Sequence, residues 1–178
     1  MLKPISALLN SDQRFDAVVV TEPSGVVRPM SQVDLHAMVA PLELPDTVPA
    51  GVRDEFDVGR NAFVYSWFCY EFTTLAERHS FATLELALRL RLDAAPPGTT
   101  RSPGLRKLLK SAVVNGYLKR EKYSAPPSFG GECVCILDAI PMLRDHLSHG
   151  NPHLLPQGSI ESMRLCREVI CDLFESKS

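Results

Sequence analysis

Residues 81–92 read Phe81-Ala82-Thr83-Leu84-Glu85-Leu86-Ala87-Leu88-Arg89-Leu90-Arg91-Leu92. Apolar side chains return every three or four positions in this segment, which is the spacing of one face of an α-helix. The predicted helix covers about 78–92, and its apolar stripe is formed by Phe81, Leu84, Leu88 and Leu92. It ends where residues 93–98 follow, because this segment contains two prolines.

The same helical spacing continues on both sides of this segment. It predicts further helices over about 54–76, 104–119, 134–148 and 159–175. Pro141 lies inside one of them and either kinks that helix or marks its true first turn. Short links join the predicted helices, so the expected fold class is mostly α, an up-and-down bundle of about five helices.

The first fifty residues have a different pattern. Phe15–Val20 is rich in β-forming residues and ends at a turn signal that contains Pro23 and Gly25. Val26–Pro29 can pair back as a second hairpin strand. Three prolines then exclude a long helix: Pro41, Pro45 and Pro49. We therefore expect residues 1–50 to form an extended or β arm that packs on a helical domain of residues 51–178.

Composition places the chain among ordinary globular proteins. It has 178 residues, a formal net charge of −2 and 45% hydrophobic residues. No apolar run approaches the ~20 residues that span a bilayer, and the N-terminal residues lack the apolar core of a secretory signal. The five cysteines include no Cys-x-x-Cys pair and are expected to be reduced, buried thiols. We expect a cytoplasmic protein with no membrane contact.

The most informative short motif lies near the C-terminus, where Arg144 precedes His149 by five positions. Arginine offers a planar fork of donors that suits phosphate, and histidine is the side chain most readily used as an acid or base near neutral pH. A purely structural interpretation is open as well. In that case His149 lies near the C-terminus of the helix, where the helix dipole favours a cation, and Arg144 pairs with a surface carboxylate.

The motif, with Asp145 directly after the arginine and a helical bundle around it, resembles the HEPN superfamily over roughly residues 54–175. Many members of that superfamily are metal-independent endoribonucleases of toxin or defence systems, and others are non-catalytic modules that bind RNA, a nucleotide or a protein. The resemblance implies a catalytic pair of Arg144 and His149, with Asp145 orienting the arginine. It implies no cofactor, and an antitoxin or a nucleotidyltransferase-type protein as partner.

The chemistry of RNA cleavage fits these residue types. A ribose 2′-OH attacks the adjacent phosphorus and the 5′-oxygen leaves, while negative charge grows on the phosphate oxygens that a guanidinium can bind. One histidine fills one proton-transfer role at a time. A homodimer would bring a second copy of the motif to the same cleft, because a twofold interface joins identical patches.

Three further features carry alternatives. Glu85 falls on the apolar stripe and either pairs with Arg89 or reaches Arg144 from a neighbouring helix. A basic stretch is either a solvated helix face or an RNA-backbone contact, and its members are Arg101, Arg106, Lys107, Lys110, Lys119, Arg120 and Lys122. Arg106, Lys107 and Lys110 are the residues of this stretch that we expect to bind RNA. His146, His149 and His153, with Asp145, are the weaker zinc alternative, and we expect no metal. The chain contains no Gly-rich phosphate loop, Gly-x-Ser-x-Gly elbow or His-Glu-x-x-His motif.

Overall fold

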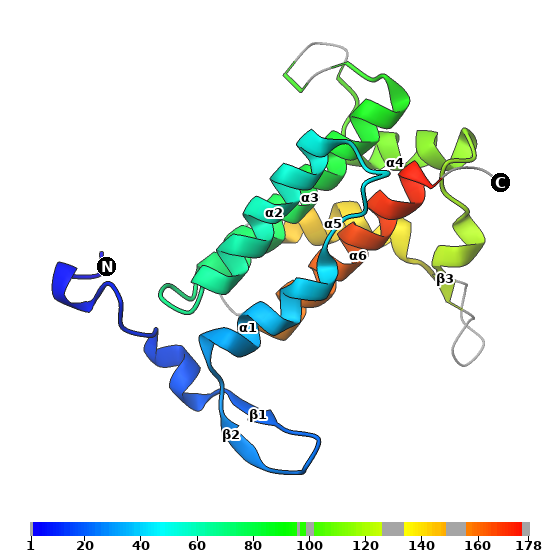
Figure 1. The fold of residues 1–178 in the computed structure, drawn as a ribbon. Coiled ribbons are helices and arrows are strands. Elements are labelled where there is room, and N and C mark those ends of the chain that lie inside the picture. Colours follow the sequence, from blue (N-terminus) through cyan, green and yellow to red (C-terminus); the bar gives the residue numbers. More distant parts are fainter. Residues whose placement is uncertain (1, 96, 99–101, 126–133, 149–155, 176–178) are drawn as a thin grey trace.

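The computed structural model describes residues 2–95, 97–98, 102–125, 134–148 and 156–175 (Figure 1). Within these ranges six α-helices form: α1 Gln32–Val39, α2 Ala50–Tyr65, α3 Phe72–Leu92, α4 Leu105–Val114, α5 Ile136–Ser148 and α6 Pro156–Phe174. Two short antiparallel hairpins accompany them, β1 Val19–Thr21 with β2 Val27–Pro29 and β3 Ser124–Ala125 with β4 Val134–Cys135. The mostly α fold class is confirmed.

Helix α3 is the centre of the bundle, and α2 and α6 lie along it (Figure 1). The predicted stripe faces this core, because Phe81, Leu84 and Leu88 are buried. Helix α2 approaches α3 closely at Gly59, where an added Cβ would lie 3.4 Å from Ser80 Oγ. The predicted end of α3 at residue 92 is confirmed.

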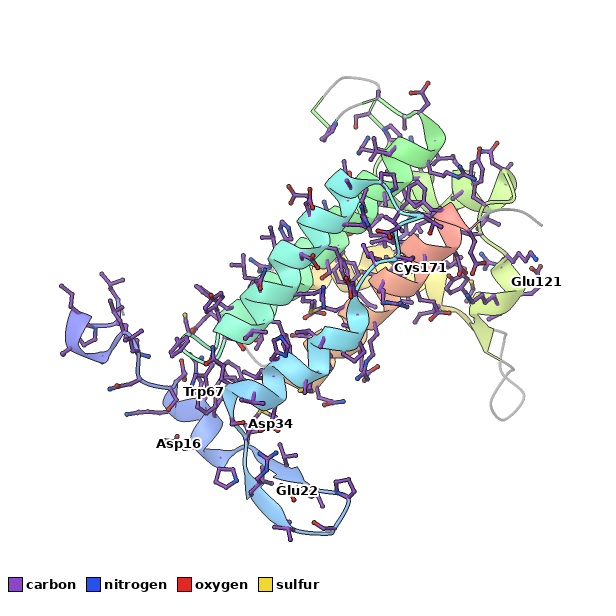
Figure 2. All side chains as sticks on the ribbon, viewed as in Figure 1. Asp16, Glu22, Asp34, Trp67, Glu121 and Cys171 are labelled. Atoms are coloured by element: carbon purple, nitrogen blue, oxygen red, sulfur yellow. The ribbon has the colours of Figure 1, made fainter. Side chains whose placement is uncertain are left out.

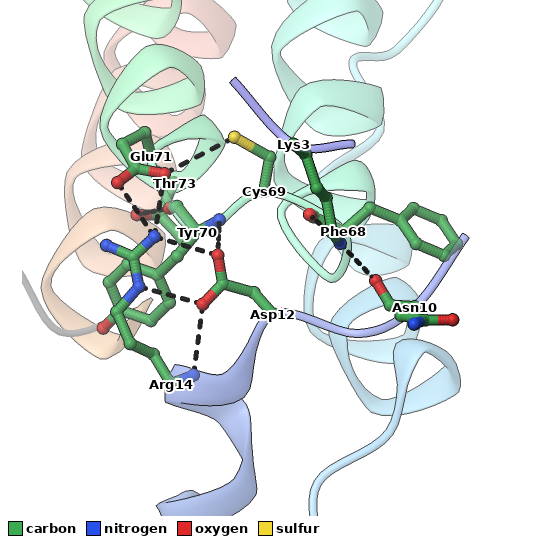
Figure 3. A network of polar contacts seen from close by, with 9 residues as sticks. All are labelled: Lys3, Asn10, Asp12, Arg14, Phe68, Cys69, Tyr70, Glu71 and Thr73. Atoms are coloured by element: carbon green, nitrogen blue, oxygen red, sulfur yellow. Dashed lines mark hydrogen bonds and ion pairs between the residues drawn. The ribbon is translucent and has the colours of Figure 1, made fainter. Parts of the chain in front are cut away.

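The prediction of one helix over 54–76 was wrong, because α2 ends at Tyr65 and α3 begins at Phe72. No glycine or proline marks the turn between them. Contacts with the N-terminal residues hold it instead: the Asp12 N–H donates to the Trp67 carbonyl at 2.8 Å, and the Tyr70 N–H donates to Asp12 Oδ2 at 3.1 Å. Figure 3 shows the contact between Asp12 and Tyr70.

The same junction carries aromatic and charged contacts. Phe15 packs against the Trp67 ring, with 5.4 Å between centroids, and Trp67 lies where the arm meets the end of α2 (Figure 2). Arg14 donates to Asp12 and to Glu71, and its bond to Asp12 holds the pKa of that carboxyl well below its usual range. The break between α2 and α3 is therefore a tertiary feature, and helical spacing alone does not reveal it.

Helix α4 is shorter than the predicted 104–119. Gly116 adopts a positive φ of 69°, its N–H donates to Val113 O, and the Tyr117 N–H donates to Ala112 O. These two bonds form a Schellman motif, which closes a helix with a left-handed glycine. Helix α6 begins at Pro156 rather than 159, and proline is favourable at a first helical position.

The N-terminal arm contains the predicted hairpin, since β1 pairs with β2. Its first strand begins at Val19 rather than at Phe15, because residues 13–17 form a 3-10 helix. The expectation that the rest of the arm is extended was wrong, because α1 forms over residues 32–39. A capping box starts it, in which Ser31 and Asp34 each bond the other's backbone N–H. Leu35 and Val39 of α1 are buried in the same core as the bundle. Among the described residues, no helix is long and apolar enough to cross a bilayer.

Candidate functional site

The first turn of α4 presents cations to solvent. Its apolar face is buried against the core through Leu105, Leu108, Leu109 and Ala112. This spacing leaves Arg106, Lys107 and Lys110 on the outer side, where all three are exposed. Helix α4 contains no acidic residue, so no carboxylate of the same helix offsets these charges.

Helix α5 brings the motif arginine to the same place. Leu137 and Ile140 anchor α5 in the core, and Arg144 and Asp145 are exposed one turn further on. Between α4 and α5 lies a pocket of about 320 Å³, which we call the cation pocket. Its lining is Gly104, Leu105, Arg106 and Lys107 from the start of α4, and Pro141, Arg144 and Asp145 from α5.

Two carboxylates contact the guanidinium of Arg144. Its Nη1 donates to Asp145 Oδ1 at 3.0 Å, and its Nη2 lies 3.9 Å from Glu85 Oε2. The Arg144 side chain remains 49% exposed, so its fork is still accessible from the pocket. Asp145 thus lies where an orienting residue would have to lie, and Arg144 has the carboxylate contacts that the structural interpretation also required.

Glu85 connects the pocket to the interior. Its Oε1 accepts from Arg89 Nη2 at 2.5 Å, while its Oε2 faces Arg144. Both contacts that the sequence offered as alternatives for Glu85 are therefore present, because its carboxylate contacts Arg89 and Arg144. Arg89 is buried and also donates to the Ala95 and Pro103 carbonyls at 2.6 and 2.8 Å.

Sequence reasoning missed the wider contacts of Arg89. Through the Pro103 carbonyl, Arg89 holds the segment that leads directly into Gly104, the first residue of the pocket wall. Its position four residues after Glu85 was the available signal. The contacts of Arg89 with the two carbonyls had no signal in the sequence, because they depend on the path of the chain between α3 and α4.

The α4 cations differ from most other cations of the protein. Carboxylates pair with Arg14, Arg28, Arg53, Arg60, Arg89, Arg120, Lys122, Arg144 and Arg164. Within the described part of the chain, no ion pair joins Arg106, Lys107 or Lys110 to a carboxylate. Asp138 is nearby, but its pKa is lowered mainly by a hydrogen bond from Arg120, and the charges of Lys110 and Arg106 add to this at longer range.

The other half of the predicted catalytic pair, His149, lies outside the described residues, as does His153. The zinc alternative is untested for the same reason, and the described residues hold no group of three or more potential metal ligands. Four cysteines are described, and all are free: Cys69, Cys135, Cys166 and Cys171.

The structure therefore places five of the predicted residues around one region. Arg106, Lys107, Arg144 and Asp145 line the cation pocket, and Glu85 lies behind it in contact with Arg144. Lys110 lines a neighbouring pocket further along α4. Comparison of the chain with protein-family models, with curated proteins and with solved structures gave no match.

Proposed function

We propose that this protein is a metal-independent endoribonuclease of the HEPN-like, toxin or defence type, and that RNA binds along α4 and α5. One observation carries the proposal. Arg106 and Lys107, which have no carboxylate partner among the described residues, line one pocket with Arg144. Unpaired guanidinium and ammonium groups gathered in this way favour a polyanion, and affinity for nucleic acids rests largely on such contacts.

In the proposed reaction, the 2′-oxygen forms a bond to phosphorus and the bond from phosphorus to the 5′-oxygen breaks. His149 accepts the 2′-OH proton, and the leaving 5′-oxygen takes up a proton. Arg144 donates two hydrogen bonds to the phosphate oxygens as their negative charge grows. The products are a 2′,3′-cyclic phosphate and a 5′-OH. Asp145 and Glu85 keep the guanidinium turned toward the pocket.

Cleavage is tested first with two substitutions. His149→Ala should lower the cleavage rate by about 10²–10⁴, because a general acid or base typically contributes that much. Arg144→Lys should also impair cleavage, since an ammonium cannot reproduce the bidentate fork. The assay follows a labelled single-stranded RNA, maps its ends and is repeated with a chelator, which should leave the activity unchanged.

Two matched substitutions serve as controls for the cleavage assay. His36→Ala removes an exposed histidine of α1, and Arg164→Lys changes an arginine of α6 that is as exposed as Arg144. Both should cleave like the unchanged protein. RNA binding without cleavage by the unchanged protein would replace the enzyme with a non-catalytic binding module. Activity that requires an added metal would contradict the mechanism.

RNA binding is tested with the α4 cations. Replacing Arg106, Lys107 and Lys110 together by alanine should weaken binding to all sequences. It should also make the slope of log affinity against log salt shallower, by about 0.7 for each lost phosphate contact on a single strand. A triple alanine variant of Arg53, Arg164 and Arg167 removes the same charge elsewhere. Equal slopes for the two triple variants would show that α4 is only a solvated face.

A further inference from the structure

A second pocket lies beside the cation pocket along the seam between α4 and α5. It has a volume of about 200 Å³, and Arg106 lines both pockets. Its walls are aliphatic: Leu109, Val113 and Val114 come from α4, and Leu137 comes from α5. We call it the aliphatic pocket.

Charged side chains complete the lining of the aliphatic pocket. Arg106 and Lys110 come from α4, Arg120 from the turn after it and Asp138 from α5. Arg120 is bound to Asp138, whereas Arg106 and Lys110 have no carboxylate partner within the described ranges. The pocket therefore combines an apolar interior with two cations that form no direct ion pair with a described carboxylate.

This combination does not fit a phosphate alone, because aliphatic walls cannot replace the water around a charged group. It does not fit a purely apolar ligand either, because such a ligand would offer the two cations no negative charge. A nucleotide in a strand meets both conditions: its base has apolar faces, and a phosphate lies on each side of its sugar. The volume is below the ~300 Å³ at which pockets for drug-sized ligands begin, so it suits one ring system.

We propose that the aliphatic pocket receives one unpaired base of single-stranded RNA. The phosphate next to this base then lies on Arg106, and the RNA strand continues from there into the cation pocket. The proposal rests on the proposed RNA-binding function and adds a subsite to it. Unpaired bases are the ones that proteins can take up in this way, because the bases of a duplex remain stacked and paired.

The test compares two oligonucleotides of equal length, one a normal single-stranded RNA and the other a fully abasic ribose-phosphate chain. Both carry the same charge, so phosphate contacts alone would bind them equally. With both pockets unaltered, the protein should prefer the normal RNA by about tenfold, the gain expected from burying roughly 55 Å² of apolar base surface. Binding is measured by fluorescence anisotropy with the His149→Ala protein, so that no RNA is cleaved.

A pocket-filling substitution locates the preference. Val113→Phe should abolish the preference for bases while the salt dependence stays the same. Val114→Phe provides a second variant that folding tolerates more readily, since Val114 is 86% exposed. Val58→Phe is the matched control on α2, where the valine is also exposed. It should keep the full preference.

The outcomes separate the subsite from the function on which it rests. Salt-dependent binding that is equal for normal and abasic chains overturns the subsite and leaves RNA binding by α4 standing. A preference that survives in both filled variants also overturns it, because the base must then bind elsewhere. No salt-dependent binding to either chain overturns the proposed function and the subsite together.

Discussion

Glu85 shows how one carboxylate can serve both the core and the surface. It lies on an apolar face of α3, where an unpaired charge would be costly. Arg89 satisfies one of its oxygens from inside the protein, and Arg144 approaches the other from the pocket. The position of the exposed arginine is therefore linked to a buried one, and a substitution at Arg89 is expected to affect Arg144 without touching it.

Glu77 is a second carboxylate of α3 and lies deeper, only 3% exposed. It accepts a hydrogen bond from Ser159 of α6 at 3.1 Å. Burial raises the pKa of Glu77 above its ordinary value near 4.5, and the hydroxyls of Ser159 and Ser162 offset part of that rise. The folded state therefore holds the Glu77 proton more tightly than the unfolded state does.

The raised pKa of Glu77 makes the stability of the protein depend on pH. Because the pKa is raised on folding, the contribution of Glu77 is fully present below pH 4.5 and is lost as the pH rises to its folded pKa. Within that window one such group lowers the free energy of unfolding by up to about 1.4 kcal/mol per pH unit. Glu77→Gln cannot ionise and should show a less negative slope, measured by urea unfolding from about pH 4 to about pH 8.

Other titrating groups are common to both proteins and cancel in this comparison. Glu161→Gln removes an exposed carboxylate of α6 that pairs with Arg164, and it controls for the loss of one charge. If the slope of Glu77→Gln matched that of the unchanged protein across the whole range, Glu77 would have the same proton affinity in the folded and unfolded states.

At the scale of the element, helical spacing located the parts of the fold that bury a continuous stripe. It predicted the end of α3, although not its start at Phe72, and it predicted the last helix to within three residues of its start. It missed the break after Tyr65, because Asp12, more than fifty residues away, holds that turn. The end of α4 and the start of α1 are different cases, since Gly116 and the Ser31–Asp34 capping box were readable signals.

The candidate site likewise has features that the sequence predicts and features that it does not. The exposure of Arg106, Lys107 and Lys110 follows from the apolar spacing of α4 itself. The meeting of Arg106 and Lys107 with Arg144 does not, because it depends on how α4 packs against α5, and the packing partner of a helix is not encoded in its own period. The aliphatic pocket is hidden from sequence patterns for the same reason, since Leu137 and Val113 belong to different helices.

At the scale of the whole molecule, aromatic side chains of α2 and of the turn after it are covered from within the chain. Phe63 is fully buried, and the arm packs Phe15 onto Trp67. Phe63 and Trp67 therefore give no support to a dimer interface. The N-terminal segment itself extends beyond the bundle (Figure 1) and exposes Leu2, Ile5 and Leu9.

The case for a homodimer now rests on the chemistry of the proposed reaction. Cleavage has a proton to remove and a proton to supply, and each chain has one motif histidine. We expect light scattering to show a dimer at micromolar concentration, with an isologous interface that brings two motifs to one cleft.

Mixing subunits tests the shared cleft directly. Arg144→Ala and His149→Ala proteins, each inactive alone, should recover part of the activity when they are unfolded together and refolded as mixed dimers. In a shared cleft the mixed dimer still holds one arginine and one histidine from opposite chains. Separate sites would recover nothing, because every chain would lack one half of its own pair, and a monomeric enzyme would give the same negative result.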